Sequence, residues 1–154
     1  MNFTCDEKLP GFAEFDFYLL EETGNWPFVL TDVNSAQITF TPYVNDVEAL
    51  IEPDSIDVNV NPKQSAEGTV QQISIVFRLI TRSEALEQLL EQYANKPGVG
   101  IGKLNNEFKK LYGTDREPMY MNYEINEGAK VDGTAFTEVR IKGETHKRPV
   151  YYTP

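Results

Sequence analysis

The stretch TVQQISIVFRLI, residues 69–80, decides the fold class. Its apolar positions recur every second residue, at Ile73, Ile75, Phe77 and Leu79. Polar residues such as Gln72, Ser74 and Arg78 lie between them. Period-two alternation is typical of a strand with one buried and one wet face, as in antiparallel sheets. The stretch FAEFDFYLLEE, residues 12–22, has the same pattern.

Shorter patterns predict further strands on both sides of these two. We expect them at residues 27–31, 37–42, 56–60, 99–104, 107–112, 120–125, 134–142 and 147–153. Asn105-Asn106 and Asp132-Gly133 are hairpin turn signals, since these residues tolerate positive φ. Residues 143–146 (GETH) read as a turn. Pro149 places the last strand at a sheet edge or at its own start.

One helix is expected at about residues 82–95. Thr81 and Glu84 have the spacing of a capping box. The apolar stripe that follows consists of Ala85, Leu86, Leu89, Leu90 and Tyr93. Such a stripe predicts that the leucines pack against the sheet. Asn95-Lys96-Pro97-Gly98 ends the helix, because proline cannot continue the hydrogen-bond ladder.

Together these elements predict one mainly β domain over residues 1–154. Its architecture is an antiparallel β-sandwich or barrel with one flanking α-helix. Residues 1–11 are expected as an N-terminal arm, and residues 61–68 (NPKQSAEG) as an extended polar hairpin loop. Long loops usually have a purpose. We therefore expect the loop to contact a neighbouring subunit through Pro62, Lys63, Gln64, Ser65, Ala66 and Glu67.

Composition excludes several classes of protein. Of the 154 residues, 40% are apolar and 12% aromatic, which supplies a core and argues against disorder. No apolar run approaches the ~18 residues of a membrane span, and we expect no signal peptide and no membrane partner. One cysteine and one histidine exclude a disulfide framework and sites that need two histidines.

Charge is uneven along the chain. The net charge is −10, and residues 1–60 hold twelve acids and one base. Residues 61–154 hold twelve acids and thirteen bases. An acidic half repels phosphate, since nucleic-acid binding needs Lys and Arg to replace counterions. The acids either keep the protein soluble or attract the second half of another copy to the acidic first half.

No motif in the chain predicts catalysis, so we expect no enzyme, no cofactor and no metal. GVGIGK, residues 98–103, lacks the spacing of a phosphate loop, and predicts a strand against which another segment packs closely. Cys5 has acidic neighbours, which disfavour the thiolate. His146 is expected to be solvated in a turn. The carboxylate pairs Glu21-Glu22 and Asp54/Asp57 lack a calcium-loop pattern.

Aromatic residues leave two interpretations open. Trp26 with Tyr151-Tyr152 would suit a stacking platform for sugars or bases. Packing in the core or at an interface is the alternative that the acidic surroundings of Trp26 favour.

The order of elements resembles that of a known protein family. A polar N-terminus and several strands precede the polar loop and the capped helix; a G-x-G strand and Asn105-Asn106 follow. The chain then reads EFKKLYGTDREPM (residues 107–119) and GAKVDGTAFTEVRIKGETHKRPVYY (residues 128–152). Over residues 12–154 this layout resembles the bacteriophage major tail tube proteins, in particular those of Bacteroidetes-type phages and prophages. Glu107 departs from the family, where a glycine often completes the asparagine turn.

The resemblance implies a structural virion protein. Six copies would form a ring, and rings would stack into a tail tube through which DNA passes without specific binding. The partners implied are further copies and other tail proteins; assembly would take place in the cytoplasm of the bacterial host. Glu14 and Asp16, opposite Phe15 and Phe17, are the candidates for facing the lumen. A tail terminator or adaptor ring, or a β-sandwich module that binds carbohydrate or peptide, are the alternatives.

Overall fold

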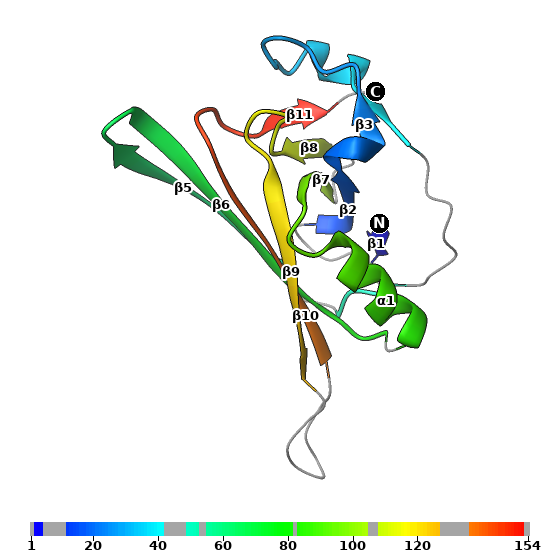
Figure 1. Cartoon of the computed structure of the whole chain (residues 1–154). Coiled ribbons are helices and arrows are strands. Elements are labelled where there is room, and N and C mark those ends of the chain that lie inside the picture. The colour runs from blue at the N-terminus through cyan, green and yellow to red at the C-terminus, as the bar shows by residue number, and fades with distance from the viewer. Residues whose placement is uncertain are drawn as a thin grey trace.

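The computed structural model describes residues 2–4, 12–41, 49–52, 55–81, 83–104, 108–126 and 136–152. The described helices are α1 (Glu84–Tyr93) and two 3-10 turns, η1 (Leu20–Glu22) and η2 (Asn34–Gln37). The described strands are β1 (Asn2–Thr4), β2 (Phe12–Leu19), β3 (Thr23–Gly24), β4 (Thr39–Phe40), β5 (Asp57–Ser65), β6 (Gly68–Leu79), β7 (Pro97–Leu104), β8 (Lys109–Tyr112), β9 (Met119–Asn126), β10 (Phe136–Thr145) and β11 (Val150–Tyr152). Figure 1 shows their arrangement.

Nine of these strands form one antiparallel sheet that forks at β7. The first two residues of β7, Pro97 and Gly98, pair with β9. Residues 100–103 of the same strand pair with β8. One branch is therefore β9-β10-β6-β5, which we call the four-strand wall, and the other is β1-β2-β7-β8-β11, the five-strand wall. The expected mainly antiparallel β fold is confirmed (Figure 1).

The main core brings together the inner faces of both walls and α1. Phe15 and Phe17 of β2 and Phe77 of β6 are fully buried in it. Leu86, Leu89 and Leu90 of α1 belong to the same cluster, at 1%, 7% and 0% exposure. The expected flanking helix and its buried leucines are thus confirmed. A smaller cluster lies on the other face of the five-strand wall, beneath residues 18–40.

The start of α1 differs from the sequence expectation. Ser83 is the N-cap, and its hydroxyl accepts a hydrogen bond from the backbone N of Leu86 at 3.1 Å. The hydroxyl of Thr81 instead accepts from the backbone N of Leu50 at 3.0 Å. The predicted Thr81–Glu84 capping box is therefore wrong, because a distant segment uses the threonine. Ala85, expected in the apolar stripe, is exposed.

The polar segment at residues 61–68 is a ladder rather than a loop. β5 continues to Ser65 and β6 begins at Gly68, so only Ala66 and Glu67 form the turn. Residues 61–69 are exposed on both faces, and hydrophobic alternation is absent there even though the backbone pairing continues. The polar composition of this segment predicts a loop, but the segment is a regular two-stranded hairpin. We call residues 61–70 the arm; it extends from the four-strand wall (Figure 1).

Other expectations need smaller corrections. Residues 27–31 form no strand, residues 37–42 contribute only the two-residue β4, and β10 continues through Thr145 instead of turning at Gly143. Within the expected N-terminal arm, residues 2–4 form edge strand β1, and Phe3 is fully buried. Asn105-Asn106 and Asp132-Gly133 lie outside the described residues. The strands on either side of each pair, β7 with β8 and β9 with β10, do pair as antiparallel neighbours.

Candidate functional site: assembly surfaces and a pocket

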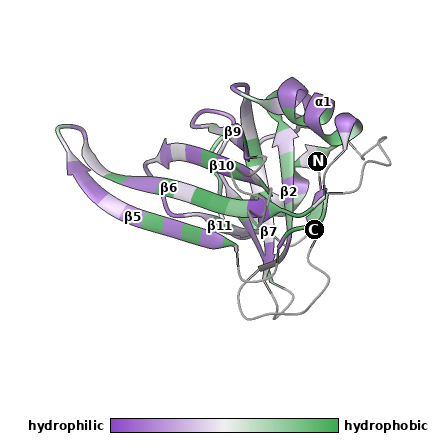
Figure 2. Cartoon of the chain, turned by 90° about the horizontal axis from the view of Figure 1, so that it is seen from below, coloured by the Kyte–Doolittle hydropathy of each residue, from purple (hydrophilic) through white to green (hydrophobic). Residues whose placement is uncertain are grey.

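The outer face of the four-strand wall is mostly polar. Because Ile75 and Ile141 point into the core, their strand neighbours point outward. Figure 2 shows the resulting alternation of hydrophilic and hydrophobic residues along β5 and β6. The charged residues of this outer face are Asp57, Lys63, Arg78, Glu124, Glu138, Arg140, Lys142 and Glu144.

Contacts within the chain occupy the two arginines of this outer face. Arg140 lies 3.1 Å from the carboxylate of Glu124 and 2.7 Å from that of Glu138. Hydrogen bonding to Glu138 raises the pKa of the Arg140 guanidinium. The guanidinium of Arg78 lies 4.3 Å above the ring of Phe136. With four acids and four bases, the face has no net charge, and its two arginines already have partners within the chain.

Both lateral edges of the four-strand wall are open in the described part of the chain. β5 ends the strand order, and no described strand pairs with its outer edge. On the other side, β7 pairs with β9 only at Met119 and Tyr120, and Met121 is bridged to Ala94. No described strand pairs with that edge along residues 122–125. Open edges are sites where another strand can add.

Glu14 and Asp16 lie on the five-strand wall, away from this polar face. Both point to the side of β2 opposite Phe15 and Phe17. Asp16 accepts a hydrogen bond from the side-chain amide of Asn2 at 2.5 Å. The two acids are therefore separated from the outer face of the four-strand wall by the whole core. The structure does not bring them together with the acids of that face.

The arm holds all six residues expected to contact a neighbouring subunit. Pro62, Lys63, Gln64 and Ser65 lie on β5, and Ala66 and Glu67 form the turn. The Ser65 hydroxyl donates to the carbonyl of Gly68 at 2.8 Å and accepts from the backbone N of Glu67, which stiffens the tip. Proline and lysine on an edge strand discourage pairing along that edge. The exposed faces of the arm are thus better suited to contact than its edge.

The glycine-rich strand packs closely, as the sequence predicted. A Cβ added to Gly98 would lie 2.6 Å from Phe17 Cζ and 2.5 Å from the carbonyl oxygen of Tyr18. A Cβ on Gly100 would overlap Phe15 Cζ. The aromatic rings of β2 therefore lie over the glycines of β7. The motif serves packing of the core.

The expected packing of the aromatic residues is confirmed for Trp26 and Tyr152. Both contact the smaller cluster, and Trp26 Nε1 donates to the hydroxyl of Thr23 at 2.9 Å. Tyr151 points elsewhere, with the ammonium of Lys110 5.1 Å from its ring centre. The three rings do not form a common stacking platform.

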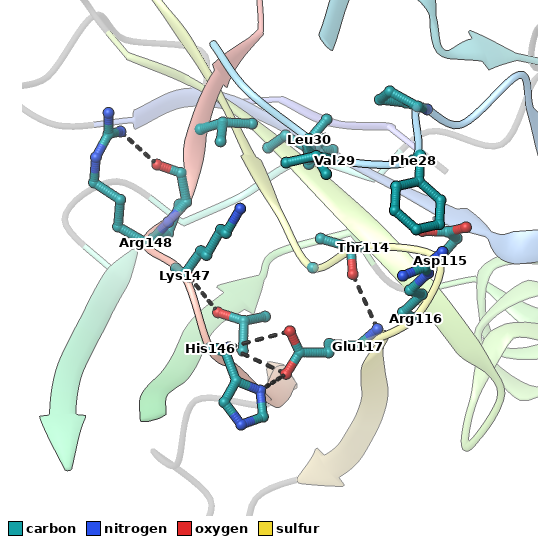
Figure 3. A pocket seen from close by; sticks show the side chains of 16 residues that line it. Phe28, Val29, Leu30, Thr114, Asp115, Arg116, Glu117, His146, Lys147 and Arg148 are labelled. Carbon is teal, nitrogen blue, oxygen red and sulfur yellow. Dashed lines mark hydrogen bonds and ion pairs between the residues drawn. The ribbon is translucent and has the colours of Figure 1, made fainter. Parts of the chain in front are cut away.

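A pocket of about 240 Å³ lies where the two walls diverge (Figure 3). Its lining comes from three segments, residues 27–30, 111–117 and 145–150. Glu117 links two of them: its carboxylate lies 2.6 Å from His146 Nδ1 and accepts from the His146 backbone N. Arg116 lies 4.5 Å above the exposed ring of Phe28. Sequence reasoning missed this pocket, because its three segments lie far apart in the chain and their patterns predict separate strands and turns.

Asp32 was also missed by sequence reasoning. Its carboxylate accepts from Arg148 Nη2 at 2.9 Å and from the backbone N of Tyr151 at 2.9 Å. The hydrogen bond from Arg148 and then the one from Tyr151 lower the pKa of this carboxyl. Asp32 thus ties the 31–37 segment to the last strand.

Glu22 and His146, which the sequence singled out, have separate partners in the fold. Glu22 accepts from the Tyr93 hydroxyl at 3.0 Å, and His146 is exposed as expected. Among the described residues, no three His, Cys, Asp or Glu side chains gather closely enough to hold a metal ion. Cys5 and Asp54 lie outside the described residues. None of the described helices is long and apolar enough to cross a membrane.

Comparison of the chain with protein-family models, curated proteins and solved structures finds no match.

Proposed function

We propose that this protein is a structural subunit of a bacteriophage tail, which forms homo-hexameric rings that stack into a tube for DNA. The observation that carries the proposal is the four-strand wall. It has one face in the core, one mostly polar face, and at each side an edge along which no described strand pairs over part of its length. A subunit of this kind buries its open edges only when copies stand side by side.

Strand direction is compatible with a closed ring. All neighbours in the four-strand wall are antiparallel, so β5 runs opposite to β9. When a copy is rotated about a ring axis, its β9 keeps its direction and meets β5 of the next copy as an antiparallel partner. Such a head-to-tail contact closes into a ring if a whole number of copies completes one full turn. The four-strand walls of these copies then form a barrel.

The polar face of the wall would line the channel. Its four acids balance its four bases, and contacts within the chain occupy its arginines, so the face has little attraction for phosphate. Glu14 and Asp16 lie across the core from this face, so one channel cannot be lined by both sets of acids. We therefore assign the lining to Asp57, Glu124, Glu138 and Glu144.

Charge reversal separates the two assignments. Glu124→Lys with Glu138→Lys should slow DNA ejection from assembled tails, and more so at low salt. Glu14→Lys with Asp16→Lys should leave ejection unchanged. The reverse outcome, slow ejection only in the second variant, would return the lining to Glu14 and Asp16.

Cysteine cross-linking tests the joint between copies. In a Cys5→Ser background, Asn59→Cys on β5 is combined with Asn122→Cys, Glu124→Cys or Asn126→Cys on β9. Oxidation should give a ladder of covalent oligomers that ends at one closed species in at least one combination. Each cysteine alone should give dimers at most, and absence of a ladder from all three combinations would refute the β5–β9 joint.

The pocket supports a second candidate, a module that binds a short peptide or a sugar. Its exposed Phe28 and Val29 lie beside charged groups, which is typical of binding sites. A panel of oligosaccharides and short peptides can be screened by the shift in melting temperature. A saturable shift that Phe28→Ala removes, in a protein that stays monomeric, would favour this function over the ring subunit.

A further inference from the structure

The last strand, β11, forms one lateral edge of the five-strand wall. Among the described strands it pairs only with β8, through Val150, Tyr151 and Tyr152. Along a strand, the backbone N–H and C=O of one residue point to the same side, and successive residues alternate. Tyr151 is therefore the one residue of β11 that turns both backbone groups away from β8. Pro149, two residues earlier, also directs its backbone away from β8.

Side chains already bind these outward groups. The Tyr151 N–H donates to Asp32 Oδ1 at 2.9 Å, and its carbonyl accepts from the Ser35 hydroxyl at 2.8 Å. Pro149 has no N–H to offer, and its carbonyl accepts from Arg148 Nη1 at 3.1 Å. Every outward backbone group from Pro149 to Tyr151 is thus either absent or bound.

The segment that carries Asp32 and Ser35 is built to stay in place. The backbone N of Thr31 donates to Asn34 Oδ1 at 2.6 Å, and the Asn34 side-chain amide donates to the carbonyl of Val29 at 2.6 Å. Ser35 is fully buried, and Ile38 anchors the segment in the smaller cluster. A buried hydroxyl that binds one strand carbonyl is costly to leave without a partner.

We propose that Asp32 and Ser35 form an edge block that keeps a second copy from pairing with β11. This inference rests on the proposed function, because it explains why copies join through the four-strand wall. The opposite end of the five-strand wall is β1, whose three residues make a short edge. Short or covered edges are the means by which natural sheets avoid unwanted pairing.

The test compares Asp32→Ala/Ser35→Ala with two matched controls. Asp32→Asn keeps an oxygen that can accept from Tyr151. Arg148→Met removes the ion pair with Asp32 and the hydrogen bond to the Pro149 carbonyl, but leaves both outward groups of Tyr151 bound. Hydrogen exchange of the Tyr151 amide is measured at a concentration where the protein is monomeric. Sedimentation and thioflavin fluorescence then report association at higher concentration.

The Tyr151 amide should exchange about tenfold faster or more in the double variant, the factor carried by a hydrogen bond to a charged group. That variant should also form irregular, thioflavin-positive aggregates, and both controls should behave like the wild type. Unchanged exchange, faster exchange without new association, or aggregation of Arg148→Met to the same extent would each overturn the edge block.

If the double variant does not fold, Asp32→Ala alone gives the same comparison. A wild-type protein that never forms rings would refute the proposed function, but the exchange and aggregation results would still decide the edge block.

Discussion

Adding one methyl group to the glycine-rich strand tests the packing of the core most simply. In Gly100→Ala the new Cβ would overlap Phe15 Cζ and lie 2.9 Å from Phe15 Cε1, in a core where Phe15 is fully buried. Overpacking of this kind costs about 1–3 kcal/mol. For a chain of this length that corresponds to a fall in melting temperature of about 2–12 °C. The assay is thermal unfolding followed by circular dichroism.

A double-mutant cycle identifies the cause. Phe15→Leu lacks the outer ring atoms, so Gly100→Ala should cost little when it is added to Phe15→Leu. The two changes should therefore be non-additive by about 1 kcal/mol or more. A neutral Gly100→Ala, or additive effects of the two substitutions, would refute the account of why glycine lies beneath Phe15.

Three further predictions concern the helix, the arm and alkaline stability. Leu89→Ala should lower the unfolding free energy by about 2–5 kcal/mol, because Leu89 is buried. The control Gln88→Ala, at an exposed position, should lower it hardly at all. Equal melting temperatures of the two variants would place α1 outside the core. Replacing residues 63–70 by Asn-Gly shortens the hairpin so that it ends at the Pro62–Gln71 pair. The melting temperature should be unchanged, but the rings should fail to stack. Normal tubes would contradict a role for the arm. Burial and then the charge of Glu22 raise the pKa of Tyr93 above its usual 10.0. Its neutral form therefore stabilises the fold below about pH 10, and this stability is lost as pH rises further. The wild type and the control Tyr120→Phe should show the same fall in melting temperature at alkaline pH, and this fall should be smaller in Tyr93→Phe.

Strands with one buried face were predictable from the sequence because burial leaves a period-two pattern. This holds for β2, β6 and β10, and the stripe of Leu86, Leu89 and Leu90 revealed α1 in the same way. The arm was missed because both faces of residues 61–69 are wet. A ladder held by backbone hydrogen bonds alone leaves no hydrophobic pattern to read.

Long-range arrangement was beyond sequence reasoning. Because the sheet forks at β7, Glu14 and Asp16 lie across the core from the polar face. No local sequence pattern predicts such a fork. Asp32 and Tyr151 are separated by 119 positions, so their contact leaves no spacing to recognise. Thr81 had the right spacing for a capping box, but its hydroxyl binds Leu50 instead.

Negative-stain electron microscopy of the purified wild-type protein, over rising concentration, tests the central claim most directly. The account predicts rings of six copies with a central channel, which stack into tubes at high concentration. Rings that never stack would instead indicate a terminator or adaptor ring. A protein that remains a monodisperse monomer at every concentration, with both edges of the four-strand wall unpaired, would contradict the account.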